Sequence, residues 1–220
     1  MRGILCLSGG KDSVYAGYLG MQLGLKVERS LIFIPEQLDS YMFHCPNIRM
    51  ASLVSECMGL TPVEVRVKGD EVESIEKVLS EIEEEYVITG AIASEYQKER
   101  FEKAAYSTGK NCLSPLWRKN ELELLREIVA SGMKVIFVGR FAEGLSEEWL
   151  GKVLCEETIG ELEKLKERYG INPSGEGGEY ETLVLDAPFF NKRLRILNTV
   201  IHSNLNSGML SVEAVVEAKS

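Results

Sequence analysis

The fold is decided by residues 4–7 (ILCL) followed directly by residues 8–13 (SGGKDS). The four apolar residues predict a buried strand, and residues 14–23 predict a helix that ends at Gly24. A strand, a glycine-rich turn and a helix N-terminus bring unpaired backbone N–H groups and the positive end of a helix dipole to one point. The stretch therefore predicts an anion-binding loop at the start of an α/β fold.

The side chains of this loop suit a phosphate ligand. Two glycines let the backbone approach closely and adopt positive φ angles, while a lysine adds a point charge and two serines add hydroxyls. The aspartate would repel a phosphate unless a Mg²⁺ ion lies between them. The residues expected at the ligand are Ser8, Gly9, Gly10, Lys11, Asp12 and Ser13. A plain glycine–serine turn before an N-capped helix is the alternative.

The loop is not a Walker A motif, because only one residue separates Leu7 from the first glycine. Its order, S-G-G-x-D-S, resembles the PP-loop of the N-type ATP pyrophosphatases, which cleave ATP between its α and β phosphates. The resemblance implies ATP and Mg²⁺ as the cofactors, with Asp12 as the metal ligand.

The composition limits the class of protein. The chain has 220 residues, of which 45% are hydrophobic and 27% charged, as expected for a soluble globular protein. No apolar run approaches the roughly 20 residues of a membrane span, and Met1 leads almost directly into the first strand, so we expect a cytoplasmic protein without a signal peptide. A net charge of −9 argues against stable nucleic-acid binding and suits a cationic substrate or a basic partner.

The cysteines form no C-x-x-C pair, which argues against a zinc or redox motif and predicts isolated, reduced thiols. They are Cys6, Cys45, Cys57, Cys112 and Cys155.

Apolar patterns predict further elements in steady alternation. Strands are expected at residues 26–34, 63–67, 86–89 and 134–138, and helices at 47–58, 70–84, 94–108 and 122–130. This alternation predicts right-handed crossovers and a parallel sheet with helices on both faces. With the PP-loop, it indicates a Rossmann-like α/β fold of the adenine nucleotide alpha-hydrolase type. Ligands of such sheets bind at the carboxyl ends of the strands, where the loop and Gly90 both lie.

After Gly139 the pattern changes. Residues 158–169 predict a helix with a capping box formed by Thr158 and Glu161. Strands expected at 180–185, 194–201 and 210–216 are joined by short turns, which predicts antiparallel pairing. We expect a PP-loop ATP-binding domain over residues 1–139 and a small α+β substrate-binding subdomain over residues 140–220.

A second unusual stretch is residues 175–182 (GEGGEYET). Three glycines and three carboxylates before an apolar strand are more than a turn needs. Glycines let a substrate lie against the backbone, and carboxylates can hold a cation, orient ammonia or bind a metal. A flexible exposed loop is the alternative. The candidate site residues are Gly175, Glu176, Gly177, Gly178, Glu179, Tyr180 and Glu181.

An aromatic-rich loop precedes the helix expected at residues 47–58, and it contains Tyr41 and His44. His44 would act as a base or an orienting donor, or as a structural hydrogen-bonding group. Trp117 would stack on a base or face a quaternary ammonium group, or pack in the core or an interface.

The helix that follows Gly90 places Ser94, Gln97 and Arg100 on roughly one face. The planar guanidinium of Arg100 suits a phosphate or carboxylate. An ordinary N-capped amphipathic helix is the alternative.

Together these segments resemble the diphthine–ammonia ligase family. The matching residues are the SGGKDS loop, Met42-Phe43-His44 with Pro46-Asn47, Gly90-Ala91-Ile92 with Ser94, Tyr96-Gln97 and Arg100, Pro115-Leu116-Trp117, and residues 175–182 with Asp186 and Pro188. The matches run in order over residues 8–188, and the glycine–glutamate stretch is the family-specific part. The chain resembles the short, archaeal-type form.

The resemblance implies the last step of diphthamide synthesis. ATP would activate the carboxylate of diphthine, a modified histidine on translation elongation factor 2, as an acyl-adenylate with release of pyrophosphate. Ammonia would then displace AMP to leave the amide. Free ammonium is the expected nitrogen source, because no glutaminase-like segment is present.

This chemistry assigns roles to the candidate residues. Lys11 and a Mg²⁺ ion near Asp12 would stabilise the departing pyrophosphate, and Glu179 or Glu181 would accept a proton from ammonium. Phe33 would form part of the adenine wall. The trimethylammonium group of diphthine would meet acidic and aromatic side chains, for which the candidates are Glu176, Glu179, Tyr180, Glu181 and Trp117.

Two other functions fit the PP-loop. One is a different ligase of this superfamily, such as a tRNA-modifying enzyme, although these usually carry a basic surface or paired cysteines. The other is a regulatory module that binds ATP without turnover. The sequence leaves a homodimer open.

Overall fold

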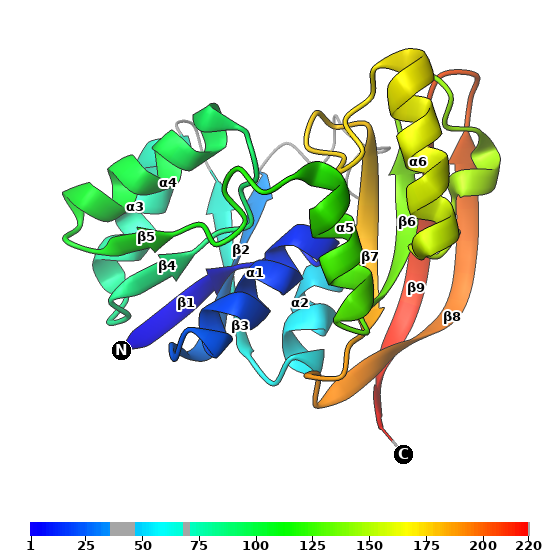
Figure 1. Ribbon diagram of the computed structural model, residues 1–220. Coiled ribbons are helices and arrows are strands. Elements are labelled where there is room, and N and C mark those ends of the chain that lie inside the picture. Colours follow the sequence, from blue (N-terminus) through cyan, green and yellow to red (C-terminus); the bar gives the residue numbers. More distant parts are fainter. Residues whose placement is uncertain (36–46, 68–70, 220) are drawn as a thin grey trace.

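The computed structural model describes residues 1–35, 47–67 and 71–219 (Figure 1). In chain order the elements are β1 (Arg2–Cys6), α1 (Lys11–Gln22), β2 (Lys26–Pro35), α2 (Ile48–Cys57), β3 (Thr61–Val67), α3 (Glu71–Glu81), β4 (Tyr86–Ile88), α4 (Glu95–Ser107), β5 (Asn111–Leu113), α5 (Glu121–Ala130), β6 (Lys134–Arg140), the 3₁₀ turn η2 (Glu147–Trp149), α6 (Glu156–Tyr169), β7 (Tyr180–Asp186), β8 (Lys192–Ser203) and β9 (Gly208–Ala218). Within these ranges no helix is long and apolar enough to cross a membrane.

Five strands form a parallel sheet in the order β3-β2-β1-β4-β5. From β1 the chain adds β2 and then β3 on one side. It then returns to the other side of β1, where it adds β4 and then β5. The strand order therefore reverses between β1 and β4, and a crevice at such a switch point is where open α/β sheets bind ligands.

Helices cover both faces of this sheet, as the alternation predicts. Neighbouring strand residues point to opposite faces, so Ile4 and Leu31 pack with α3 and α4, whereas Leu5 and Ile32 pack with α1 and α2. Each strand is thus buried on both sides, which explains its nearly continuous apolar sequence. The expected α/β fold with a parallel sheet is confirmed.

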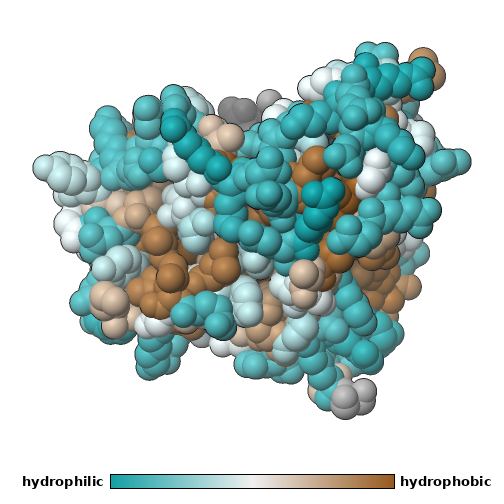
Figure 2. All heavy atoms as spheres, viewed as in Figure 1, coloured by the Kyte–Doolittle hydropathy of each residue, from teal (hydrophilic) through white to brown (hydrophobic). Residues whose placement is uncertain are grey.

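The remaining strands form an antiparallel sheet in the order β7-β6-β9-β8. Helix α1 contacts β7, and α2 contacts β7, β8 and β9, so these helices lie against both sheets. Through this shared helical layer, the face of the parallel sheet that packs on α1 and α2 forms one continuous core cluster with the antiparallel sheet, while the face that packs on α3 and α4 forms a second cluster. Hydrophilic residues cover most of the face seen in Figure 2, with apolar residues gathered over β1 and α1 and between α5 and α6.

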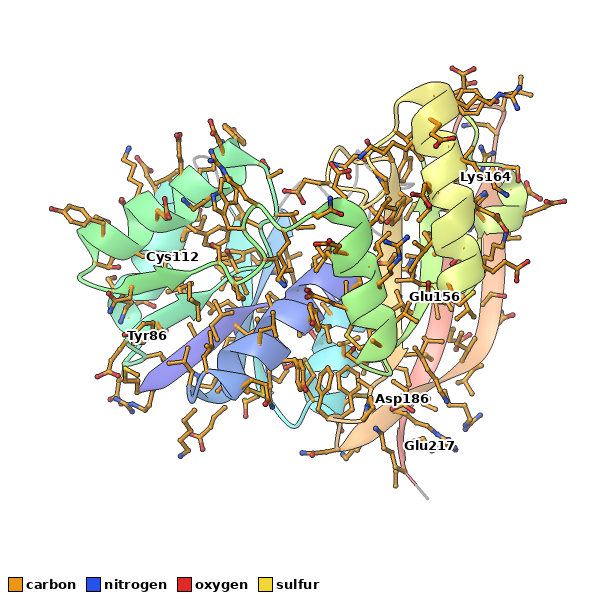
Figure 3. The ribbon with its side chains drawn as sticks, in the orientation of Figure 1. Tyr86, Cys112, Glu156, Lys164, Asp186 and Glu217 are labelled. Atoms are coloured by element: carbon orange, nitrogen blue, oxygen red, sulfur yellow. The ribbon has the colours of Figure 1, made fainter. Side chains whose placement is uncertain are left out.

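One strand prediction needs correction, and one strand was not predicted. Residues 134–138 were expected as a fifth parallel strand, but β6 pairs with β7 and β9 in the antiparallel sheet. Six of its seven residues are buried, so its sequence has the continuous apolar run of a parallel strand although its neighbours are antiparallel. The fifth parallel strand is instead β5, which contains Cys112 and pairs with β4 (Figure 3). With three residues, β5 is too short to show a period.

A division at residue 139 would separate β6 from the strands with which it pairs, because the chain leaves the parallel sheet after β5. The division into domains over residues 1–139 and 140–220 stays a prediction.

The start of α6 also differs from the expectation. The helix begins at Glu156, and Thr158 is its third residue rather than its N-cap. Its hydroxyl accepts the backbone N–H of Cys155 at 2.8 Å, while Glu161 accepts from the side chain of Lys152. The predicted capping box of Thr158 and Glu161 is therefore wrong, since the cap lies one turn earlier.

We expect opposite stability effects from alanine at two glycines. A Cβ on Gly90 would lie 2.8 Å from the backbone nitrogen of Ser13, whereas one on Gly160, within α6, would meet nothing within 4 Å. Gly90→Ala should lower the free energy of unfolding by about 1–3 kcal/mol, because backbone atoms must move. Gly160→Ala should raise it by about 0.5–1 kcal/mol through helix propensity. Urea denaturation measures both, and equal changes would contradict the close packing of β4 on α1.

Candidate active site

A cavity of about 690 Å³ lies at the switch point, with walls from both sheets. The parallel sheet contributes the loop after β1, Gly90 after β4, and the end of β2. The antiparallel sheet contributes the start of β7 and the glycine–glutamate loop before it. Most of the predicted site residues in the described part of the chain therefore line one cavity.

The PP-loop is braced by its own side chains. The hydroxyls of Ser8 and Ser13 lie 3.1 Å apart, and Ser13 Oγ donates to the carbonyl of Gly10 at 3.0 Å. Gly9 has a φ of +83°, as predicted, but Gly10 is extended with a φ of −81° and serves as the N-cap of α1. Positive φ angles were expected at both glycines, and only Gly9 adopts one.

Strand β7 is hydrogen-bonded to this loop. The Thr182 hydroxyl accepts the backbone N–H of Lys11 at 3.1 Å, and the Val184 N–H donates to the carbonyl of Gly9 at 3.0 Å. Thr182 therefore satisfies one of the first N–H groups of α1, which lack partners within the helix. Sequence reasoning did not assign Thr182 to the site, and its place inside the glycine–glutamate motif was the available signal.

Lys11 is almost fully buried, with 2% of its surface exposed. Its Nζ donates to Asp12 Oδ2 at 2.8 Å and to the carbonyl of Ser174 at 2.5 Å. The lysine thus joins the PP-loop to the loop that precedes β7. A role in phosphate binding stays a prediction.

Asp12 has one oxygen free. Its Oδ1 is buried and has no hydrogen-bond partner among the described residues, while Oδ2 binds Lys11. Burial raises the pKa of Asp12, Lys11 opposes that shift, and the charge of Glu176 adds to it. A buried carboxylate oxygen without a partner suits a metal ion. No group of three potential metal-ligating side chains gathers in the described ranges, so a Mg²⁺ ion here would rely on Asp12, phosphates and water.

The glycine–glutamate loop is ordered by contacts that the sequence did not reveal. Glu176 Oε1 accepts the backbone N–H groups of Ile92, Ala93 and Ser94 at 3.2, 2.9 and 2.9 Å. The buried Tyr180 hydroxyl donates to the carbonyl of Pro173 at 2.5 Å, and burial raises the pKa of this tyrosine. Oε1 of Glu176 and the hydroxyl of Tyr180 are therefore already occupied, although both residues line the cavity.

The other two glutamates of the motif differ from each other. Glu179 Oε1 accepts the N–H of Asn172 at 2.9 Å, and its buried Oε2 has no partner among the described residues. Glu181 lines the cavity and is accessible to solvent, yet the surrounding protein withdraws enough water to raise its pKa. Of the two candidate bases, Glu181 is the one on the cavity wall.

The cavity lining also includes apolar side chains that suit a nucleobase. Phe33 is in edge contact with Phe101, with ring centroids 5.7 Å apart, and both line the cavity, as does Arg100. Ser94 lies directly before α4, where its N–H binds Glu176, and it does not line the cavity. A cavity that combines apolar side chains with a few polar groups is the usual form of a cofactor site.

Some predicted residues are not placed in the cavity. Trp117 does not line it, and Lys98 Nζ lies over its ring at 4.6 Å. Tyr41 and His44 lie outside the described residues, as does the side chain of Gln97. Their roles stay predictions.

Comparison with known protein families shows to which family the chain belongs. Residues 1–112 match the family described as the diphthamide synthase N-terminal domain, and residues 120–218 match the diphthamide synthase C-terminal domain. The chain belongs to the diphthamide synthase family. The resemblance to diphthine–ammonia ligases is therefore confirmed.

Relatives within this family match over most of the chain. A zebrafish (Danio rerio) protein named diphthine–ammonia ligase is 34% identical over 93% of this chain and 90% of its own length. The human (Homo sapiens) protein of that name is 32% identical over 92% of this chain and 86% of its own length. The Schizosaccharomyces pombe protein of that name is 34% identical over 97% of this chain, which corresponds to 39% of the yeast protein.

A solved structure is also similar to this diphthamide synthase family member. It is described as a predicted subunit of tRNA methyltransferase from Methanocaldococcus jannaschii, and it has a TM-score of 0.47 and 16% sequence identity. The match covers 86% of this chain and 98% of that one.

We expect the Thr182 hydroxyl to stabilise the start of α1. Thr182→Val keeps the shape but removes the acceptor for the Lys11 N–H, so the free energy of unfolding should fall by about 1 kcal/mol, as for a lost helix cap. The affinity for ATP should fall as well, because the loop loses its brace. Thr182→Ser retains the hydroxyl and is the control. Urea denaturation and calorimetric titration with ATP measure both effects, and equal behaviour of Val and Ser would contradict the role.

Proposed function

We propose that the chain is an AMP-forming ligase that amidates diphthine on translation elongation factor 2 with ammonium. The observation that carries the proposal is a single cavity walled by the PP-loop on one side and the glycine–glutamate loop on the other. The relatives named diphthine–ammonia ligase support the same reaction. The PP-loop supports ATP as the co-substrate.

The protein's contribution to the first half of the reaction is electrostatic. A carboxylate is a poor electrophile, and adenylation gives it a good leaving group. The first-turn N–H groups of α1 and the buried cation of Lys11 would stabilise charge that develops on the departing pyrophosphate. Gly90 has no side chain to separate the end of β4 from this region, and it lines the cavity. Phe33 would support the adenine ring, and Arg100 would bind phosphate.

Mg²⁺ fits the free Oδ1 of Asp12 and, when bound, would neutralise phosphate charge. Lys11 holds the other oxygen of this carboxylate at 2.8 Å, which fixes the orientation of the free one.

The second half of the reaction needs a proton acceptor for ammonium. Glu181 suits this role because it lines the cavity and its pKa is raised toward the working range of a general base. Glu179 is the second candidate, although one of its oxygens already binds Asn172.

The trimethylammonium group of diphthine would be held by charge and by aromatic contact. Glu181 is the most accessible carboxylate of the motif, and the glycines of the loop would let the substrate lie against the backbone. Gly175, Gly177, Gly178, Ser94, Gln97, Tyr180, Trp117, Tyr41 and His44 complete the proposed substrate side. A cytoplasmic location and a homodimer are also part of the proposal.

We expect AMP and pyrophosphate to form only when all four reactants are present. Incubation with ATP, Mg²⁺, ammonium and diphthine-bearing elongation factor should give both products and a mass shift of the factor. Factor whose target histidine is unmodified is the matched control and should give neither. ADP and phosphate as products would contradict the ligase reaction, and turnover that depends on tRNA would indicate a different PP-loop ligase.

Glu181 should determine the pH dependence of amidation. A base must be ionised, so with a raised pKa the wild-type rate should rise as the pH rises through that pKa and then level off. Glu181→Gln should lower the rate at neutral pH by about 10²-fold or more, because general-base catalysis is lost. The variant's residual rate should keep rising with pH, since it depends on free ammonia.

Rates at constant total ammonium, measured from acidic pH, near the ordinary pKa of a glutamate, up to alkaline pH, test this prediction. Glu147→Gln, in the exposed turn η2, is the control and should follow the wild type. A Glu181→Gln profile that overlays the wild-type profile would assign the proton transfer elsewhere.

A further inference from the structure

Glu176 connects two segments that are far apart in the sequence. Its Oε1 accepts three backbone N–H groups from residues 82 to 84 positions earlier, in the turn directly before α4. Three hydrogen bonds to one oxygen fix the position of the loop relative to this turn. The contact therefore holds the glycine–glutamate loop to the segment that leads into α4.

The opposite side of the same loop is attached to α1. Lys11 Nζ donates to the carbonyl of Ser174, two residues before Glu176. Before that point the loop is also ordered internally, since both the N–H and the hydroxyl of Ser174 donate to Asn172 Oδ1. The loop thus spans the switch point between two attachments, with Ser174 on the α1 side and Glu176 on the α4 side.

Between these attachments, the Gly175 N–H donates to the carbonyl of Asn172, and after them the Gly178 N–H donates to the carbonyl of Gly175. Gly175 has a φ of +76°, and a Cβ there would lie 2.9 Å from the ring of Tyr180. Gly177 and Gly178 are exposed. A backbone of glycines has no side chains to pack, so its position depends on the residues that anchor it.

We propose that Glu176 is a positioning residue, which fixes the glycine–glutamate loop over the nucleotide cavity instead of contacting the substrate cation. An oxygen that already accepts three N–H groups is not available to a ligand without leaving those donors unpaired. The inference deepens the proposed function, and its kinetic test rests on it. Its structural test does not.

Two substitutions separate the two roles because they remove different properties. Glu176→Gln removes the charge but keeps a carbonyl oxygen at the same reach, and Glu176→Asp keeps the charge but withdraws it by one methylene. If Glu176 positions the loop, shortening its side chain should impair the protein more than removing its charge. If Glu176 binds a trimethylammonium ion, removing its charge should impair the protein more than shortening its side chain.

We expect Glu176→Gln to remain within about threefold of the wild type in KM for ATP and in amide exchange at residues 92–94. Glu176→Asp should speed exchange of these amides and raise KM for ATP by about tenfold each, with a smaller change in kcat, because the loop opens locally. Glu95→Ala removes an exposed acid at the first residue of α4 and is the matched control, with no change expected in either quantity.

A larger effect of Glu176→Gln than of Glu176→Asp would overturn the proposal. If Glu176→Gln raised KM for the protein substrate while Glu176→Asp did not, Glu176 would be a substrate contact. Unchanged amide exchange in both variants would also overturn it. If the wild type failed to amidate diphthine, the proposed function would fail, while exchange and ATP affinity would still decide whether Glu176 positions the loop.

Discussion

The hydrogen bonds between β7 and the PP-loop hold the two sheets together at one site. The Thr182 hydroxyl and the Val184 N–H bind the backbone of residues on either side of Gly10. A Cβ on Gly10 would lie 3.3 Å from the carbonyl of Thr182, so this approach needs a small residue at the start of α1. Gly10 has a negative φ, so a glycine is needed there for the close contact with β7 and not for its backbone conformation. This contact therefore fixes the start of β7, and with it the end of the glycine–glutamate loop, relative to the PP-loop.

A largely buried pair of opposite charges, Lys11 and Asp12, lies at this junction. Lys11 and Asp12 form an ion pair with the lysine almost fully buried, and a buried pair gains little stability once desolvation is subtracted. One oxygen of Asp12 also lacks a partner, which adds a further cost. A site that keeps such a group against stability is characteristic of function, because natural sequences depart from good packing mainly where they bind or react. Burial raises the pKa of Asp12. A cation bound beside this carboxylate would act in the opposite direction, because it favours the ionised form.

Local sequence patterns predicted the parts of the structure that depend on local physics. The alternation of strands and helices up to β4, the turn at Gly9 and the ends of most helices follow from propensity and periodicity within about 15 residues. The sheet to which β6 belongs could not be predicted in this way, because its buried sequence is equally compatible with parallel and antiparallel neighbours. The partners of Glu176 lie more than 80 residues away, so its motif indicated importance without indicating what it contacts. Glu181, which faces the cavity, and Glu176, which binds the turn before α4, look alike in the sequence.

The two attachments of the glycine–glutamate loop have a further consequence for how the site is coupled. Lys11 Nζ binds the loop carbonyl and the Asp12 carboxylate at the same time, so a change in the position of Lys11 acts on the loop directly. Glu176 connects the same loop to the turn before α4, and its charge acts on Asp12 as well. The glycine–glutamate loop is therefore joined to the PP-loop by a hydrogen bond and by charge. Such an arrangement lets the ordering of the glycine–glutamate loop depend on the state of the PP-loop through short, direct contacts.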